Sequence, residues 1–487
     1  MMPQAWIAML FMILTAVLIY IYAGYPVVLF LLAKVFPRRH RQDGGYEPSV
    51  TLIISAHNEK EVIGRKLQNA LELDYPQEKL SIVVVSDAST DGTDDIVRTF
   101  SRHNVRLVRP AQRRGKTAGL NLALKEVTTE IVVFSDANAM YERSAIHCLV
   151  RHFADVSVGY AVGYARYEDA SDTAAGNSEG AYWDMEVKVK EWESAFSSVV
   201  GGDGAIYAIR RHLYEPMQET DINDFVNPLQ IVAKGYRGIF DAEARCTEHP
   251  AGSFGKEFSR KVRIANRSFN GLLRVLDACN PLKVGRFAWL LISHKLLRWF
   301  SPFILLIHFA ASVAAGNRGA AGLSALVFVC GYGAVAALAL VGWWQDKRGR
   351  SRAVFYIPYY FMLMNIASAT GILMRLKGKV ISVWETVRAE TSKMDGAEFV
   401  LPVLLFGIVI TSVVKISVWF EVGDVVQLAF AQAFFPPFIL ARTSPHRQGR
   451  DSGPMAENAD GTETPGKGFP QAGPAETVVH GRCACVE

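Results

Sequence analysis

The sequence predicts an α/β fold, in which a parallel sheet carries helices on both faces, joined to helices that cross a membrane. Residues 1–33 contain no charged side chain, and a basic cluster follows directly: Lys34, Arg38, Arg39 and Arg41. Short apolar runs then alternate with amphipathic stretches. Two of these runs, VVVSDASTDGT at 83–93 and IVVFSDANA at 131–139, end in acidic residues. The pattern predicts an acid-lined site beside a membrane.

The first 36 residues are long enough for a membrane span, which needs about 20 apolar residues. The segment lacks the positive start of a signal peptide, so it is expected to be an uncleaved anchor. Lys and Arg collect on the cytoplasmic side of membrane segments. The basic cluster therefore places the N-terminus outside and residues from about 40 to 290 in the cytoplasm, in a multi-pass protein of the cell inner membrane.

The second half of the chain contains further apolar segments, expected as spans at 299–317, 319–343 and 354–374 and as a hairpin at 399–420 and 425–441. Basic loops at 347–350 and 375–379 both have the composition of cytoplasmic loops, so the segment between them is expected to be partly re-entrant or interfacial. The expected domains are an anchor at 1–36, an α/β domain at 45–285, interface and membrane helices at 286–441 and a disordered tail at 442–487.

The composition indicates which classes of partner the protein is expected to bind. The net charge of +5 is modest and can lie next to lipid headgroups, so membrane lipid is an expected partner and nucleic acid is not. The six cysteines are scattered and, apart from a pair near the terminus, lack the spacing of zinc ligands. Reduced thiols in a reducing compartment are expected.

Ligands of parallel sheets bind beyond the carboxyl ends of the strands. Strands are expected at 50–56, 81–86, 105–110 and 130–136, and Glu59, Asp87 and Asp136 follow three of them. Carboxylates at one edge repel each other unless a cation or hydrogen-bond donors share the site. Asp136 and Asn138 could both face a hard cation, Mg²⁺ or Mn²⁺, which prefers oxygen ligands. The alternative for each acidic residue is a helix cap or an Asx turn.

Lys116 lies in RRGKTAGLN, where a loop enters a helix. Helix N-termini attract phosphate and the lysine adds a point charge, although a solvated basic loop is the alternative. Further along, Asp221 and Asp224 precede a helix, so one could be a cap and one a general base for a substrate hydroxyl. Arg260, Arg263 and Arg267 share a helix face that could bind a diphosphate or, alternatively, lipid headgroups.

Seven ordered blocks carry a family resemblance: SAHNE (55–59), SDASTDGT (86–93), GKTAGLN (115–121), SDANA (135–139), GGDGAIYAIRR (201–211), NDFVNPLQIVAKGY (223–236) and RKVRI (260–264). Together they resemble the membrane-bound family 2 glycosyltransferases, which include the cellulose, chitin, hyaluronan and poly-N-acetylglucosamine synthases. The resemblance covers residues from about 50 to 300. It implies a GT-A fold for the α/β domain, a nucleotide-diphospho-sugar donor that is usually UDP-linked, a divalent metal and inversion at the anomeric carbon.

The resemblance also implies roles for individual residues. Glu59 and Asp87 would hold the nucleoside, and Lys116 would approach the nucleotide or diphosphate. Asp136 would be the first aspartate of the D-x-D motif and lie at the metal. Asp224 would be the aspartate of T-E-D and remove the proton of the acceptor. The matches to the first and fourth positions of Q-x-x-R-W are Arg260 and Arg263.

Four positions depart from the family pattern. Asn138 replaces the second aspartate of D-x-D and Asn223 replaces the glutamate of T-E-D. In Q-x-x-R-W, Arg260 replaces the glutamine and Ile264 replaces the tryptophan. That tryptophan belongs to the acceptor end in processive synthases. A K-x-x-R-W spacing does occur at Lys295, Arg298 and Trp299, at the membrane entry, where an interface anchor is expected.

The leading expectation is an inverting hexosyltransferase that extends a polysaccharide at the inner face of the membrane, with export-complex subunits as further partners. The alternative is transfer of one sugar to a lipid or a polyprenyl-phosphate acceptor. A catalytically silent scaffold that only binds a nucleotide is the reading from a different class, and a transporter is disfavoured because the spans are few and hold little internal charge.

Overall fold

The computed structural model describes residues 4–167, 174–248, 254–316, 322–348 and 352–381. All of them belong to one compact unit, Met1–Phe430. The hairpin expected at 399–420 and 425–441 and the tail expected from 442 lie outside the described residues.

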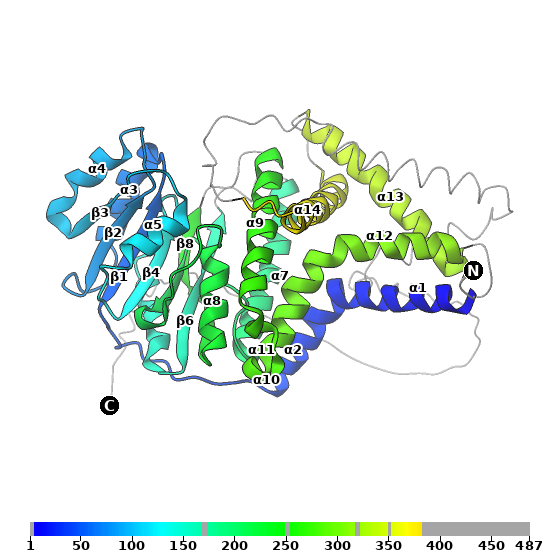
Figure 1. Cartoon of the computed structure of the whole chain (residues 1–487), viewed down its shortest axis with the longest axis horizontal. Helices are drawn as coiled ribbons and strands as arrows, with labels where there is room; N and C mark the ends of the chain where they lie inside the picture. The colour runs from blue at the N-terminus through cyan, green and yellow to red at the C-terminus, as the bar shows by residue number, and fades with distance from the viewer. Residues whose placement is uncertain (1–3, 168–173, 249–253, 317–321, 349–351, 382–487) are drawn as a thin grey trace, which may run out of the picture. The chain divides into compact units, whose positions relative to one another are not determined.

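The α/β part is built on one eight-stranded sheet with the order β3-β2-β1-β4-β7-β6-β8-β5 among the described residues (Figure 1). The strands are β1 (Val50–Ala56), β2 (Leu80–Ser86), β3 (Val105–Val108), β4 (Ile131–Asp136), β5 (Met140–Tyr141), β6 (Val158–Tyr167), β7 (Tyr207–Arg210) and β8 (Arg237–Glu248). The first four pair in parallel, as expected. The sheet then becomes mixed, because β7 runs antiparallel to β4 and β6 and β5 runs antiparallel to β8. The purely parallel sheet of the prediction is therefore corrected.

Buried side chains line both faces of this sheet. In β1, Leu52 and Ile54 point into one core cluster and Ile53 into the other. Strands covered on both faces read as continuous apolar runs, which is why VTLIISA was recognisable without alternation.

The helices of the α/β part are α3 (Lys60–Leu71), α4 (Thr93–Thr99), α5 (Lys116–Ala123), α6 (Ala145–Val150), α7 (Ala174–Phe196), α8 (Asn223–Ala233) and α9 (Phe254–Arg274). Three-residue and four-residue 3₁₀ turns lie at Ser101–His103, Arg151–Ala154, Arg211–Leu213 and Leu276–Cys279. Asp91 forms an Asx turn just before α4, where Gly92 is the N-cap: its carboxylate accepts hydrogen bonds from the backbone N–H of Thr93 and from that of Lys60 at the start of α3, both at 3.0 Å.

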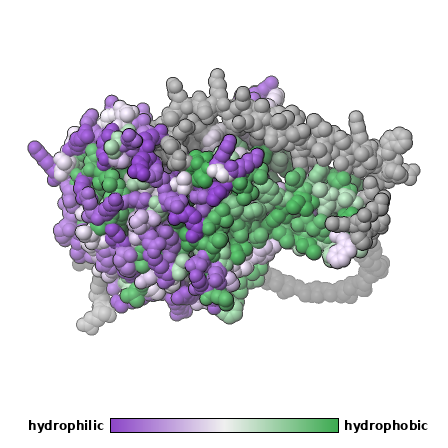
Figure 2. All heavy atoms as spheres, in the orientation of Figure 1, coloured by the Kyte–Doolittle hydropathy of each residue, from purple (hydrophilic) through white to green (hydrophobic). Residues whose placement is uncertain are grey.

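Four helical segments of the described chain are long and apolar enough to cross a membrane: Ala5–Val35, Arg286–Ala315, Gly322–Asp346 and Val354–Leu376. The first comprises α1 (Gln4–Ile19), a π-turn (Tyr20–Gly24) and α2 (Tyr25–Val35). After α10 (Pro281–Val284), the second comprises α11 (Arg286–Leu291), a π-turn (Ile292–Leu296) and α12 (Leu297–Ala315). The others are α13 (Gly322–Asp346) and α14 (Ala353–Leu376). Figure 2 shows hydrophobic side chains gathered over these helices and hydrophilic ones over the sheet domain.

Two expectations concern the later helices: a re-entrant or interfacial segment at 354–374 and a basic, aromatic segment at the membrane interface. The helix α14 is continuous, so residues 353–376 contain no re-entrant turn, and an interfacial placement stays a prediction. The basic, aromatic segment expected to lie at the membrane interface begins with α9, and this helix packs against α14. Within that contact Asn266 Nδ2 donates to Gly371 O and to Lys379 O, both at 3.0 Å.

Candidate active site

Three charged side chains, drawn from three separate parts of the chain, converge on Gly204. A Cβ atom placed on this glycine would lie 3.2 Å from Asp224 Oδ2, 3.5 Å from Lys116 Nζ and 3.7 Å from Asp136 Oδ2. Asp136 is the last residue of β4, Lys116 the first of α5, and Asp224 lies in the first turn of α8. The fold thus brings these three candidate residues to one point at the carboxyl edge of the parallel strands.

Lys116 is positioned by the turn before it. Gly115 has φ +92°, a left-handed conformation that favours glycine. The Lys116 ammonium donates to Asp136 Oδ1 at 2.5 Å and to Gly204 O at 3.4 Å. A cation is therefore held beside the acidic group of the site, Asp136, Asp203, Asp224 and Glu248.

Asp87 acts on the same turn. Its carboxylate is almost fully buried and accepts hydrogen bonds from the backbone N–H groups of Arg114 and Gly115, both at 2.9 Å. Its carbonyl oxygen is 2.7 Å from Nδ1 of His57. The geometry makes Asp87 the anchor of the loop that delivers Lys116.

Glu59 lies at the start of α3 and is buried. Its backbone N–H donates to Thr93 Oγ1 at 2.9 Å, so the loops after β1 and β2 are tied together. Two neighbours in these loops, Asn58 and Ala88, have left-handed φ values of +53° and +52°. Such conformations cost free energy and collect at ligand sites.

Asp224 has the environment of a base. Its Oδ1 is buried and has no hydrogen-bond partner in the described structure. Burial raises the pKa of Asp224, the Lys116 ammonium opposes this, and the charges of Asp203 and Asp136 add to it, so that the pKa lies at about 6. A carboxylate whose pKa is close to neutral is well matched to accept a proton from a hydroxyl group.

The acidic group also fits a divalent cation. Asn138 is half-buried two residues beyond Asp136 and makes no hydrogen bond with the described residues. Burial, together with the charges of Asp136 and Asp203, raises the pKa of Glu248 to about 8. This crowding of negative charge suits a hard cation with oxygen ligands. No set of three or more His, Cys, Asp or Glu side chains in the described residues is arranged as a metal centre.

The arginines of α9 separate into different roles. Arg260 Nε pairs with Glu257 Oε2 at 2.8 Å, and its charge lowers the pKa of Glu248, which places it near the acidic group. Arg263 is half-buried on the same helix. Arg267, expected on a shared diphosphate-binding face, instead donates to the backbone oxygens of Thr220 and Glu219 at 3.1 and 3.0 Å. It fastens the loop that precedes α8.

Trp299 of α12 contacts a residue beside Asp224, and its role as an interface anchor stays a prediction. Its ring meets the edge of the Phe225 ring at a centroid distance of 5.4 Å, and Phe225 directly follows Asp224. The neighbouring Arg298 forms an ion pair with Glu186 of α7. The first turn of α12 therefore contacts the helix that carries Asp224.

Sequence reasoning missed two carboxylates of the site, Asp203 and Glu248. Asp203 Oδ2 is 3.6 Å from Lys190 Nζ, and its charge raises the pKa of Asp224. The only available signal for Asp203 was its place in the glycine-rich stretch GGDG. Glu248 had none, because it reaches the site through the pairing of Met140 with Thr247, which brings the ends of β5 and β8 together.

The chain is similar to known glycosyltransferases. The family model described as glycosyl transferase family 2 matches residues 51–216. The probable glycosyltransferase YdaM of Bacillus subtilis is 29% identical over 198 residues, 39% of this chain and 47% of that protein. The poly-β-1,6-N-acetyl-D-glucosamine synthase of Staphylococcus aureus is 23% identical over 266 residues, 53% of this chain and 64% of that protein. The chain thus spans less than two thirds of both relatives.

A solved structure extends the similarity to most of the chain. The mannosyltransferase PcManGT from Pyrobaculum calidifontis, in complex with GDP-Man and Mn²⁺, is 26% identical with a TM-score of 0.58. The match covers 76% of this chain and 99% of that one. The α/β part of the chain accordingly has the GT-A fold.

Proposed function

We propose that the chain is a family 2 glycosyltransferase, an inverting enzyme that moves a sugar from a nucleotide-diphospho-sugar, UDP-linked, to a growing polysaccharide. The observation that carries the proposal is the convergence of Lys116, Asp136 and Asp224 on Gly204. A base, a cation and an acidic group suited to a metal are the parts that this reaction requires.

In the proposed reaction the Asp224 carboxylate accepts the proton of the acceptor hydroxyl, whose oxygen attacks the anomeric carbon. The bond from that carbon to the diphosphate oxygen breaks, and the nucleoside diphosphate leaves with the electron pair. A single displacement inverts the configuration. Negative charge grows on the leaving group, where the fixed cation of Lys116 stabilises it.

Asp136 and Asn138 are the proposed ligands of Mg²⁺ or Mn²⁺, and the bound cation would add positive charge at the diphosphate. Arg260 and Arg263 are proposed for the diphosphate as well, and Glu59 for the nucleoside. Asp87 is proposed to support the nucleoside end through the loop that it anchors.

The proposed setting is the cell inner membrane, with the GT-A domain of residues 45–285 in the cytoplasm between an anchor at 1–36 and the helices of 286–441. The basic residues that follow the first span support this orientation. Membrane lipid and export-complex subunits are the remaining partners of the proposal.

Incubation of the detergent-purified protein with a panel of nucleotide sugars and Mn²⁺ tests the proposal. The panel includes UDP-linked donors and GDP-mannose, since the similar archaeal enzyme was solved with GDP-Man. Consumption of one donor with release of its nucleoside diphosphate is expected. A protein that consumes none of them with any acceptor, polysaccharide or lipid, would be a scaffold rather than an enzyme.

Transfer of a single sugar to a lipid or polyprenyl-phosphate acceptor is the second candidate. It is favoured by Ile264 in place of the acceptor-end tryptophan and by the contact of the membrane segment, through Trp299, with Phe225 beside the proposed base. Partition of labelled product between butanol and water separates the two: polysaccharide stays in water and a glycolipid enters butanol.

A further inference from the structure

Lys66 of α3 is a buried charged residue for which the proposed reaction has no direct use. Its side chain has no exposed surface. The ammonium donates a hydrogen bond to the backbone oxygen of Ala139 and lies 3.9 Å from the centroid of the Tyr141 ring. Ala139 directly follows Asn138, so Lys66 holds the turn that carries both proposed metal ligands.

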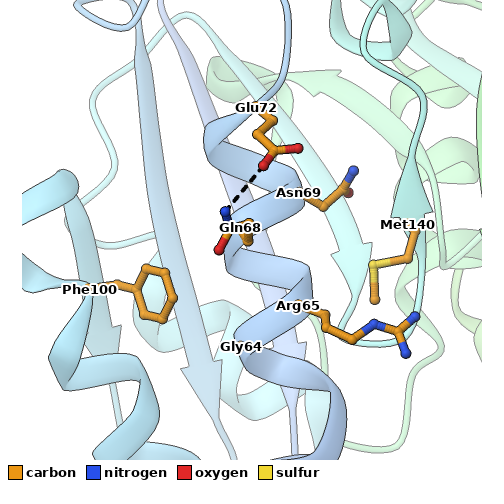
Figure 3. Close-up of a pocket in the computed structure, with 7 residues that line it drawn as sticks. All are labelled: Gly64, Arg65, Gln68, Asn69, Glu72, Phe100 and Met140. Carbon is orange, nitrogen blue, oxygen red and sulfur yellow. Dashed lines mark hydrogen bonds between the residues drawn. The ribbon is translucent and has the colours of Figure 1, made fainter.

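A second residue of α3, Asn69, lies three positions after Lys66 and hydrogen-bonds to the end of the same Asp136–Tyr141 segment. Asn69 Nδ2 donates to Tyr141 O, and the backbone N–H of Tyr141 donates to Asn69 Oδ1, both at 2.8 Å. Figure 3 shows Asn69 on the side of α3 that faces Met140, beside a groove of about 690 Å³ that Arg65 also lines. Lys66 is absent from this lining because it points into the core.

Tyr141 links the turn that Lys66 and Asn69 hold to strand β4 and to the loop that contains Gly204. Its hydroxyl lies 3.0 Å from the backbone oxygens of both Phe134 and Ala205. Phe134 is two residues before Asp136, and Ala205 follows Gly204. One buried ring therefore joins the strand that ends in Asp136 to the loop on which the site converges, and the Lys66 ammonium lies against that ring.

Packing alone does not account for a lysine here. Burying an ammonium group costs free energy that an apolar side chain of similar length, such as methionine, would not. Burial lowers the pKa of Lys66 to about 7, and Cys246, Asp136 and Glu248 oppose that shift only in part. The side chain's distinctive contribution is a hydrogen-bond donor directed at the Ala139 carbonyl.

We propose that Lys66 is a positioning residue that fixes the Asp136–Asn138 turn in the conformation that binds the divalent cation. The inference rests on the proposed function, because it assigns the cation to this turn. Lys66 acts through the Ala139 carbonyl and the Tyr141 ring and touches neither the sugar nor the diphosphate.

The test compares Lys66→Met, which removes the donor, with Lys66→Gln, which keeps an N–H donor without the charge. Arg65→Met is the matched control, since Arg65 is the preceding residue of α3 and is exposed. Binding of Mn²⁺ in the presence of UDP is measured by the loss of the free Mn²⁺ electron paramagnetic resonance signal. Amide hydrogen exchange over residues 134–142 is measured on the same samples without metal.

Lys66→Met is expected to weaken Mn²⁺ binding by about tenfold or more and to speed exchange at 137–141, while its melting temperature stays at or above that of the wild type. Lys66→Gln is expected to recover Mn²⁺ binding to within about threefold, and Arg65→Met to match the wild type. Wild-type Mn²⁺ affinity in Lys66→Met, or no recovery in Lys66→Gln, would overturn the inference. Failure of the wild type to consume any sugar donor would instead overturn the proposed function, and the exchange and Mn²⁺ comparisons would still decide the role of Lys66.

Discussion

Replacement of Asp224 by asparagine separates the catalytic cost of this carboxylate from its cost to stability. The substitution keeps the shape of the side chain and removes its ability to take a proton. A general base contributes roughly 10²–10⁴ in rate, so turnover of Asp224→Asn is expected to fall by at least about 100-fold. Donor binding should persist, because Lys116 and Asp136 remain.

The stability effect has the opposite sign and depends on pH. The pKa of Asp224 is about 6 in the folded protein, against an ordinary value of 3.8, mainly because the carboxyl is buried. Between these values the folded protein binds more protons than the unfolded chain, so the stabilisation by the protonated carboxyl is lost as the pH rises through about 6. The difference corresponds to about 3 kcal/mol. Asp224→Asn never ionises, so above pH 6 it should unfold at a higher temperature than the wild type.

The assay is a pair of melting curves at pH 5 and pH 8 on purified protein, together with turnover at pH 8. Asp224→Asn should gain stability relative to the wild type at pH 8 and gain much less at pH 5. Asp95→Asn, at an exposed carboxylate paired with Arg98, is the control and should change neither measurement. Turnover above about a tenth of the wild-type rate would refute the base assignment, and a melting difference that is independent of pH would refute the electrostatic reasoning.

Four further tests probe the same site. Gly204→Ala would put a methyl group 3.2 Å from Asp224 Oδ2, so kcat should fall about tenfold or more while the melting temperature is not lowered. Gly44→Ala is the control: there is open space around its Cβ position, so neither kcat nor the melting temperature should change. Lys116→Met should cost roughly 10²–10³ in kcat, as loss of a fixed charge in a transition state does, and a wild-type rate would exclude Lys116 from stabilising the leaving group. Chelation with EDTA should abolish turnover and added Mn²⁺ or Mg²⁺ should restore it; full activity in the chelator would remove the metal role from Asp136. The pH profile of kcat/KM should fall below about pH 6 as Asp224 takes up a proton, and a flat profile down to pH 5 would contradict that pKa.

The part of the site that could be predicted from the sequence is the part set by local rules. Asp87 and Asp136 each lie at or directly after the end of a buried apolar run, and parallel pairing of β2, β1 and β4 brings such ends to one edge. Lys116 follows a glycine at the entry to a helix. These positions depend on strand direction and turn chemistry, which short stretches of sequence encode.

The remainder depends on pairings between distant segments. β7 and β5 join the sheet antiparallel, and nothing in YAIR or MY specifies the partner strand. Asp203 and Glu248 reach the acidic group only through this topology, so neither could be assigned beforehand. Arg267 shows the converse limit: its helix face was foreseen, but the loop of Glu219 and Thr220 takes up its guanidinium.

Asp87 shows why a correct location does not by itself give a role. Both of its carboxylate oxygens accept backbone N–H groups of the loop that ends at Gly115, one residue before Lys116. These two bonds take one lone pair of each oxygen, so the carboxylate holds the loop whether or not a ribose hydroxyl reaches the lone pairs that remain. Loss of this carboxylate would also displace Lys116, so the damage would reach the diphosphate as well as the nucleoside. The physical link from β2 to the leaving group therefore runs through the backbone of residues 114–116, which couples the nucleoside edge of the sheet to the reacting centre.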